Sequence, residues 1–390
     1  MNVPKLRFKE FSDEWISKKL FQLVEFSKGN ILAKADLAET GNYPCILYGQ
    51  LYTKYNEVIR KIYSKTNRNE NNIPKSKKGD VLIPSSGETP IDISTSSCIQ
   101  IDNVLLGGDI NILRPISCDG RFLSYLINNN KKTEIAKVAQ GHSVVHLYND
   151  NLKQVSINIP SIQEQKRISD TLELLDKKIE LQTKKIEDLK LFKMSTLDKY
   201  FNKDTCKEKA LLKKYCSCLT GKSKADKVDI NGNYYIMDMG TVNSDGNILK
   251  TKPTFCNLDL LSYGDLVMPK DDIGGGLIIG KTGFIDEDNK YVLGDHVYLL
   301  KVNDINSLFL HYQINSKYIN KQLKRKVTGS AQLGLKSDNI LNQEIYIYSE
   351  EEQKKIANIF KLIDRKIELE TEKIFKLINL KKGLMQNMFV

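Results

Sequence analysis

The sequence predicts an α+β protein with a pseudo-two-fold internal repeat, in which two globular lobes are separated by two long helices that pair as an antiparallel coiled coil. Three observations carry this prediction. Segments of the two halves match at a constant offset of 188 residues, each half ends in a long heptad pattern, and short strand-like runs precede each pattern. The expected order along the chain is lobe, helix, lobe, helix.

The repeat is clearest where each lobe meets its helix. The matches are SIQEQKRI at 161–168 with SEEEQKKI at 349–356, DKKIEL at 176–181 with DRKIEL at 364–369, and Gly141 with Gly329. Upstream the correspondence is weaker and its offset drifts, as expected where loops have changed length. We infer that the lobes share a framework but not their loops.

Both helices have a well-defined predicted start and a heptad seam. A Ser is followed three residues later by Glu, at Ser161 and at Ser349, which is the pattern of a capping box. Apolar residues then alternate spacings of four and three, with a polar residue at the same place in both copies. The seam residues are Ile168, Leu172, Leu175, Ile179, Gln182, Ile186 and Leu189 in the first copy, and Ile356, Phe360, Ile363, Ile367, Glu370, Ile374 and Leu377 in the second.

Connectivity predicts the direction in which the helices pair. Neither has an interior proline, so each can run for about 40 residues, or about 60 Å. The first helix delivers the chain to lobe two at that distance, so the second can pair along its length only by running back, with one lobe at each end. The expected segments are a first lobe with its N-terminal segment at 1–157, a helix within 158–203, a second lobe at 204–345 and a helix within 346–390.

A second apolar line runs beside the seam. It consists of Leu174 and Leu181 in the first helix and of Leu362 and Leu369 in the second. These leucines either broaden the seam within the molecule or dock the helices of a partner, and the pattern alone leaves both readings open.

Within the lobes, short runs bounded by Gly, Asp, Pro and Asn predict strands and two short helices. The expected strands are 43–48, 81–84, 110–113, 265–268 and 297–300, and the expected helices are 122–127 and 308–314. Each lobe is therefore expected to be α+β.

The composition favours a polyanionic partner and an intracellular protein. The formal net charge is +11, and subtracting +1 for residues 161–201 and +2 for residues 349–390 leaves +8 outside the helices. Such a surplus suits nucleic acid, although a lysine-rich soluble protein would show it too. Without a secretory signal or a long apolar stretch, we expect a cytoplasmic protein that does not enter a membrane. The seven scattered cysteines indicate reduced thiols and no metal site.

Two segments in each lobe are the predicted DNA contacts. A basic stretch with a glycine turn precedes each helix, and a polar loop follows each Gly-Asp strand; Lys and Arg can hold phosphates, while Gln, His, Ser and Thr can reach base edges. The residues are Lys131, Lys132, Lys137, Gln140, His142, Ser143, Ser85 and Ser86 in lobe one, and Lys324, Arg325, Lys326, Thr328, Ser330 and Lys270 in lobe two. A solvated basic helix end remains the alternative.

No segment carries the pattern of a catalytic site. Residues 275–282 (GGLIIGKT) fit the spacing of a phosphate loop, but residues 277–279 form a β-type run and no helix signature follows. A methyltransferase would need an adenosylmethionine-type glycine turn and a catalytic Asn/Asp-Pro-Pro-aromatic loop, which the sequence lacks. Residues 270–272 (KDD) are the nearest candidate for nuclease chemistry, yet lobe one has no counterpart, so they are read as a polar loop.

The whole chain resembles the specificity subunits of type I restriction-modification systems. The resemblance rests on the lobe, helix, lobe, helix order, on residues 160–168 and 349–356, and on the opening segment 4–15 (PKLRFKEFSDEW). The second copy departs from the pattern with Tyr348 in place of Pro160.

This resemblance implies a DNA-binding subunit without catalysis of its own. Each lobe would read one half of a bipartite, asymmetric target in double-stranded DNA, and the helices would set the spacer. Two methyltransferase subunits and the motor-nuclease subunits would be the partners, and they would carry S-adenosylmethionine, ATP and Mg²⁺. The rival hypotheses are a DNA-independent coiled-coil adaptor and the specificity module of a fused restriction enzyme.

Overall fold

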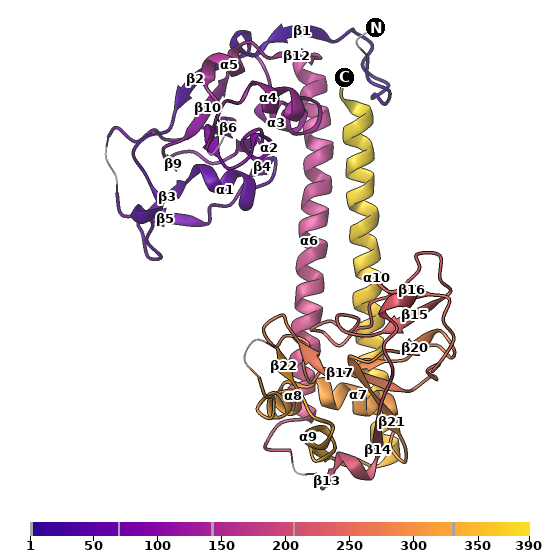
Figure 1. Cartoon of the computed structure of the whole chain (residues 1–390). Coiled ribbons are helices and arrows are strands. Elements are labelled where there is room, and N and C mark those ends of the chain that lie inside the picture. Colours follow the sequence, from indigo (N-terminus) through magenta and orange to yellow (C-terminus); the bar gives the residue numbers. More distant parts are fainter. Residues whose placement is uncertain (1–2, 69–70, 142–143, 206, 330–331) are drawn as a thin grey trace. The chain divides into compact units, whose positions relative to one another are not determined.

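The computed structural model describes residues 3–68, 71–141, 144–205, 207–329 and 332–390, and it divides into two compact units. Unit one comprises residues 1–182 and 373–390, and unit two comprises residues 183–372. Each unit contains one lobe and a portion of both long helices, α6 (Ile162–Tyr200) and α10 (Glu350–Met388) (Figure 1). Both helices are 39 residues long, which confirms the length expected from the heptad patterns.

Lobe one is built on two sheets and two ribbons (Figure 1). The larger sheet has the order β2-β10-β6-β8-β4, with bounds Val24–Lys28, Ile110–Pro115, Val81–Pro84, Ser97–Ile99 and Val58–Ile59. The smaller sheet has the order β5-β3-β9, with bounds Ser64–Thr66, Tyr43–Ile46 and Leu105–Leu106. The ribbons pair β1 (Ile16–Lys19) with β12 (Ser156–Ile159), and β7 (Ser86–Gly87) with β11 (Val145–His146).

Lobe two repeats this topology strand for strand except for β4. Its larger sheet has the order β14-β21-β17-β19, with bounds Cys216–Thr220, Val297–Val302, Leu266–Pro269 and Gly283–Phe284. The smaller sheet is β16-β15-β20, with bounds Pro253–Thr254, Tyr234–Met237 and Tyr291–Leu293. The ribbons pair β13 (Lys209–Leu211) with β23 (Glu344–Tyr346), and β18 (Asp271–Asp272) with β22 (Leu333–Gly334). The internal repeat therefore extends through the lobes.

Short helices cover the sheets. In lobe one they are α1 (Tyr48–Thr53), α2 (Pro90–Ile93), α3 (Gly120–Leu126), α4 (Lys132–Val138) and α5 (Asn149–Lys153), with a π-helical turn η3 (Ile127–Lys131) and 3₁₀ turns η1 (Leu20–Gln22) and η2 (Lys34–Asp36). In lobe two they are α7 (Ser307–Asn315), α8 (Lys317–Lys324) and α9 (Ser337–Leu341), with η4 (Leu212–Lys214) and η5 (Ala225–Lys227). The run expected as one strand over 43–48 is divided, because β3 ends at Ile46 and α1 begins at Tyr48.

Each lobe shares its core with both long helices. In unit one, Phe122 of α3 packs against Trp15 and against Phe389 beyond α10, with ring centroids 5.8 and 5.3 Å apart. In unit two, Phe309 of α7 contacts Phe201 and Tyr348 at 5.5 Å each. Because aromatic side chains bury large areas, these contacts join each lobe firmly to its helices.

The helices run antiparallel within each unit. In unit two, Lys185 of α6 pairs with Glu370 of α10 at 3.0 Å, and Lys193 of α6 pairs with Asp364 of α10 at 2.5 Å. Residue numbers along α6 therefore rise where those along α10 fall. In unit one, the first turns of α6 share a core with the last turns of α10.

The seam is buried unevenly along its length. Ile168, Leu172, Leu175, Ile356, Phe360 and Glu370 are buried, whereas Ile179, Gln182, Ile186, Leu189, Ile363, Ile367, Ile374 and Leu377 are half-buried. Glu370 is completely buried and is paired with both Lys185 and Lys366, which offsets the cost of burying its charge.

The predicted capping boxes differ between the two helix starts. At α10 the box is reciprocal, since the Glu352 amide donates to Ser349 Oγ and the Ser349 amide donates to Glu352 Oε2. At α6 the Glu164 amide donates to Ser161 Oγ, but the Glu164 carboxylate accepts two hydrogen bonds of 2.8 Å from Arg7 instead of reaching back. The expectation of a full box at Ser161 was therefore wrong, because a buried ion pair occupies the carboxylate.

Candidate nucleic-acid interface

In each lobe the predicted polar loop pairs with the strand that directly follows the predicted basic stretch, which makes a short two-stranded ribbon. In lobe one the loop after β6 pairs through β7 with β11, so that Gly87 lies opposite Val145. In lobe two the loop after β17 pairs through β18 with β22, so that Asp272 lies opposite Leu333. We call these pairs the lobe-one ribbon and the lobe-two ribbon.

A glycine with a positive φ lies at the same place beside each ribbon. Gly141 and Gly329, which correspond in the repeat, have φ values of +118° and +98°. A Cβ atom at either position would come within 2.2 Å of a carbonyl oxygen, that of Val144 or of Gln332. Only glycine fits there without strain, so the repeated glycine is explained by backbone geometry. His142, Ser143 and Ser330, predicted as DNA contacts, lie outside the described residues.

Some of the predicted lobe-one contacts are accessible and others are not. Lys137 and Gln140 are exposed before the ribbon, and Lys132 is half-buried. Lys131 is ion-paired with Glu134 at 2.7 Å. Ser85 and Ser86 are buried at 6% and 5% exposure, which argues against direct contact of these hydroxyls with a base edge.

In lobe two, Arg325 and Thr328 are at least partly accessible, and so is Lys324. The other two predicted lysines have partners within the lobe. Lys326 Nζ donates to the carbonyl oxygens of residues 339 and 342 and to the side chain of residue 343, and Lys270 Nζ donates to the Asp295 carbonyl oxygen at 2.7 Å. Their ammonium groups hold the loops around the ribbon together.

The surroundings of the ribbons differ in chemistry. Beside the lobe-one ribbon, the exposed Tyr148 ring stacks with His146 at 6.1 Å and lies 5.5 Å from Lys28 Nζ. Beside the lobe-two ribbon, Ile273 and Leu277 are about two-thirds exposed. In residues 145–148 (VHLY) apolar and aromatic residues alternate, so a strand there would place the two rings on one face. Nothing in the sequence indicates that Lys28 lies beside them. The lobes thus present unlike side chains on a common frame.

The phosphate-loop-like segment of lobe two encloses a carboxylate of the chain itself. Asp272, 2% exposed, accepts hydrogen bonds from the amides of Gly274, Ile278 and Ile279. Residues 277–279 form turns and bends instead of the expected β-type run. An internal carboxylate therefore takes the place that an anionic ligand would need.

Gln165 and Gln353, which correspond in the repeated motif, join each lobe to its helix. Gln165 Oε1 accepts a hydrogen bond from the Asp119 amide at 2.9 Å, and Gln353 Oε1 accepts one from the Asn306 amide at 2.8 Å. Each glutamine also donates to the carbonyl oxygen of the residue just before the helix cap. The repeated glutamine is thus structural, because it satisfies polar groups at both the lobe and the helix.

A Tyr-Asp-Lys triad recurs in both units. In unit one, Tyr125 donates to Asp176 of α6 at 2.6 Å, and Lys381 of α10 pairs with the same carboxylate at 2.6 Å. In unit two, Tyr312 of α7 donates to Asp364 of α10 at 2.8 Å, and Lys193 of α6 pairs with that carboxylate at 2.5 Å. Burial, followed by the neighbouring carboxylate, raises the pKa of both tyrosines above its ordinary value, so both remain hydrogen-bond donors.

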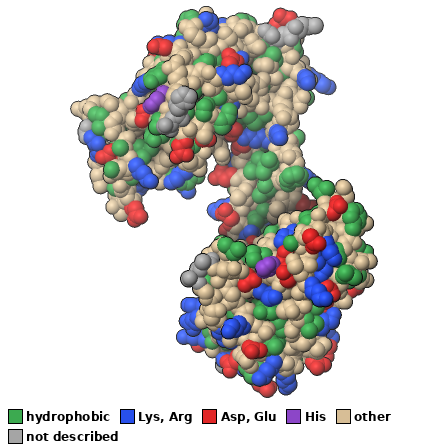
Figure 2. Space-filling view, viewed as in Figure 1, with side chains coloured by type: hydrophobic (Ala, Val, Ile, Leu, Met, Phe, Trp, Pro, Cys, Tyr) green, Lys and Arg blue, Asp and Glu red, His purple; other side chains and the backbone are tan. Residues whose placement is uncertain are grey.

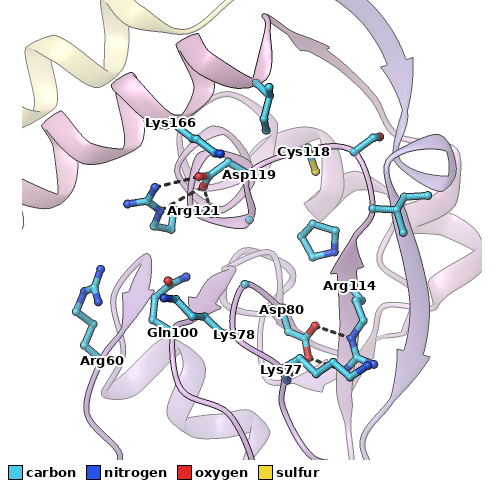
Figure 3. A pocket seen from close by; sticks show the side chains of 16 residues that line it. Arg60, Lys77, Lys78, Asp80, Gln100, Arg114, Cys118, Asp119, Arg121 and Lys166 are labelled. Carbon is cyan, nitrogen blue, oxygen red and sulfur yellow. Dashed lines mark hydrogen bonds and ion pairs between the residues drawn. The ribbon is translucent and has the colours of Figure 1, made fainter.

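A cavity of about 990 Å³ lies in unit one between lobe one and the start of α6 (Figure 3). Its lining includes two carboxylates and six cationic side chains, namely Asp80, Asp119, Arg60, Lys77, Lys78, Arg114, Arg121 and Lys166. We call it the basic pocket. No local pattern in the sequence indicates it, because its cations come from segments that are distant along the chain.

The second apolar line is exposed on both helices. Leu174, Leu181, Leu362 and Leu369 are 56%, 59%, 72% and 37% exposed, so they do not broaden the seam. Phe192 of α6 and Leu380 of α10, which correspond in the repeat, are also exposed. Each unit therefore presents an apolar helix surface. The lobe of unit two is different in character, since Figure 2 shows Lys and Arg side chains interspersed with acidic ones on its visible surface.

The described cysteines are free thiols. Among the described residues, one group of side chains is spaced closely enough to hold a metal ion. This group is Asp238, Asp295 and His296 in lobe two, but the Asp238 carboxylate is already paired with Lys252 at 2.7 Å. Among the described residues, no helix is both long and apolar enough to cross a membrane.

The family model described as the type I restriction modification DNA specificity domain matches residues 12–191 and 216–379. The chain is 24% identical over 408 residues to the type I restriction enzyme MjaVIII specificity subunit of Methanocaldococcus jannaschii, covering 96% of this chain and 91% of that protein. A putative type I restriction enzyme specificity subunit of Haemophilus influenzae is 30% identical over 190 residues, covering 44% of this chain and 45% of that protein. The crystal structure of the S subunit of the M. genitalium type I restriction-modification system shares the fold, with a TM-score of 0.70, 17% identity and coverage of 100% and 99%.

Proposed function

The chain belongs to the family of type I restriction-modification DNA specificity subunits, and on this premise we propose that its two ribbons read the two halves of a bipartite, asymmetric DNA target. The subunit recognises DNA for a complex whose other subunits modify and cleave it. Its residues supply binding and positioning, while the methyltransferase partners hold S-adenosylmethionine and the motor-nuclease partners use ATP and Mg²⁺.

The observation that carries the proposal is the repetition of the frame without repetition of the side chains. Both lobes keep the same strand order and the same glycine with a positive φ, yet lobe one presents Gln140 and Tyr148 where lobe two presents Thr328 and Lys336. Base edges in the major groove differ in donor and acceptor pattern, so unlike side chains on a common frame read unlike half-sites. A DNA-independent adaptor would not require this divergence.

The exposed apolar surfaces support the proposal of two methyltransferase partners. Leu174 and Leu181 lie in unit one, and their counterparts Leu362 and Leu369 lie in unit two. Because the surfaces are related by the internal repeat, two copies of one partner can dock in equivalent ways. A single partner helix against each surface would bury an apolar stripe that is now in water.

The experiment that tests the proposal is an exchange of one lobe. Residues 205–340 are replaced by the equivalent lobe of a family member with a different target, and the chain is assembled with its methyltransferase partner. Mapping of methylated sites is expected to show one altered half-site and one unchanged half-site. Loss of both half-sites in a complex that still assembles would contradict independent reading, and methylation by the purified chain alone would contradict its lack of catalysis.

A further inference from the structure

We propose that the basic pocket of lobe one binds a backbone phosphate of the DNA, and that lobe two lacks this site. The inference rests on the proposed function, because it adds a sequence-independent contact to DNA reading by the ribbons. It concerns Lys77, Lys78 and Lys166, none of which was predicted as a DNA contact.

The pocket retains a positive charge after its internal ion pairs are formed. Arg114 binds both oxygens of Asp80 at 2.9 and 2.8 Å, and Arg121 binds Asp119 at 3.0 Å (Figure 3). Arg60 pairs with a glutamate of α6. The pocket's three lysines are exposed and have no ion pair among the residues that the structure describes. Lys77 and Lys78 line the cavity from the loop before β6, and Lys166 lines it from the N-terminal end of α6.

The turn that carries two of these lysines has a counterpart in lobe two that can be matched residue by residue. The Lys77 amide donates to Asp80 Oδ2 at 2.8 Å, and the Ser262 amide donates to the equivalent aspartate at 2.9 Å. The Lys78 amide donates to Asp102 Oδ1, and the Tyr263 amide donates to Asp288 Oδ1, each at 2.7 Å. The two turns are therefore equivalent, although their offset differs from that of the helices.

Lobe two keeps the framework of the pocket, but two of the three lysines are replaced and the third is ion-paired. The Asp80–Arg114 pair is replaced by Asp265 with Lys301, at 2.9 Å. Ser262 and Tyr263 stand where lobe one has Lys77 and Lys78. The counterpart of Lys166 is Lys354, whose charge is paired with Glu350 of its own helix. Because the turn in lobe two keeps its fold with Ser262 and Tyr263, Lys77 and Lys78 are not needed for folding of the turn.

The position of the pocket favours DNA phosphate over an acidic segment of a partner subunit. The pocket lies at the start of β6 and the lobe-one ribbon follows its end, so a contact there is separate from base reading. Lys166 is on the helix face that bears Glu173, about 80° around the helix from Leu174. It therefore lies beside the apolar line and not on it. Lysine ammonium groups act as point charges, which suit phosphates without sequence information.

The test measures the salt dependence of DNA affinity for the chain assembled with its methyltransferase partner. A triple variant, Lys77→Gln, Lys78→Gln and Lys166→Gln, is compared with the wild type and with Lys354→Gln as the matched control from lobe two. Anisotropy of a labelled duplex is followed from about 50 to about 200 mM salt. The slope of log affinity against log salt is expected to become shallower by about 0.9, which is the change for the loss of one bound phosphate.

Affinity for target and non-target duplexes should fall by the same factor in the triple variant, so that their ratio is preserved, and Lys354→Gln should leave the slope unchanged. A wild-type slope in the triple variant, with the complex intact, would overturn the phosphate site. Failure of the variant to assemble while the bare chain stays folded would overturn it in favour of an acidic partner segment. If the wild-type complex does not distinguish target from non-target DNA, the proposed function fails instead.

Discussion

At the scale of single residues, a histidine inside the core of lobe two has a strongly lowered pKa. His311 of α7 is buried, and its Nδ1 lies 3.2 Å from Thr282 Oγ1. Burial, helped by the charges of Lys193 and Lys281, lowers the pKa of His311 to about 3. The imidazole is therefore neutral in the folded chain at every pH at which the protein would be studied.

This shift predicts that acid destabilises lobe two. The unfolded chain takes up the proton near pH 6.5 whereas the folded chain does not, so stability is fully present above that pH and is lost as the pH falls toward 3. Between about pH 6.5 and pH 5 the wild type should lose about 1 to 2 kcal/mol more of its unfolding free energy than His311→Gln. Urea denaturation at both pH values measures the difference. Equal losses in the two proteins would show that His311 is not the responsible group.

The accessibility of the candidate residues could be predicted from sequence only in part. A basic, polar stretch correctly indicated that Lys137 and Arg325 reach solvent, because solvated cations need no particular partner. The predicted contacts also included Ser86 of the polar loop, which is buried, and Lys326, whose ammonium is bound by the lobe. Burial and hydrogen-bond partners come from segments far apart along the chain, and a local pattern does not contain them.

At the scale of elements, the long helices were the most predictable part of the molecule. Their heptads, caps and repeated motif are local signals, and the observed helices begin and end within a few residues of the expected bounds. The ribbons were not predictable as ribbons. Segments near 86 and 145 were singled out for composition, and only the fold shows that they pair. The same holds for the triads, in which Asp176 was visible as part of a repeated motif but not its contact with Tyr125.

The exposed leucines give a prediction for the helices. Leu174→Glu or Leu362→Glu places a charge on one apolar surface, and because each side chain is more than half exposed, the free energy of unfolding of the chain alone should stay within about 0.5 kcal/mol of the wild type. Each variant should lose one of two methyltransferase subunits, and the double variant should lose both. Mass measurement of the assembled complex by light scattering checks this. Full assembly of the double variant would place the partner elsewhere.

The control for these variants lies on the same helix. Lys190→Glu reverses a charge at an exposed position of α6 that lies about 160° around the helix from Leu174 and about 180° from Leu181, thus outside the apolar line. Assembly of this variant should equal that of the wild type, which would separate the loss of the apolar surface from a general effect of negative charge on α6.

At the scale of the whole molecule, the internal repeat explains how one chain can serve an asymmetric target. Cross-helix pairs such as Lys381 with Asp176 and Lys193 with Asp364 are repeated, as are the glycine turns and the sheet orders. The differences that we propose to bear on DNA binding lie in the ribbons and in the basic pocket. Duplication supplies the common frame, and divergence of loop residues supplies two unlike readers.

The last prediction concerns the length of the helices, which we propose sets the spacer between the half-sites. Removal of residues 179–185 deletes one heptad, so the seam stays in phase while α6 becomes shorter by about 10 Å, equivalent to about three base pairs. If α10 bulges or slips, it absorbs part of this change, so the expected spacer is shorter by about one to three base pairs, and the half-sites themselves are unchanged.

Residues 367–373 are the corresponding heptad of α10. When both heptads are deleted, the two helices are shortened equally, so α10 no longer needs to bulge or slip. The double deletion should give the full shift of about three base pairs and a more uniform spacer than the single one. Deletion of one or two residues should instead rotate the seam out of phase and lower the free energy of unfolding. Methylation mapping of the assembled complexes reads the spacer directly. A double deletion with full activity and the original spacer would show that the helices do not set the distance.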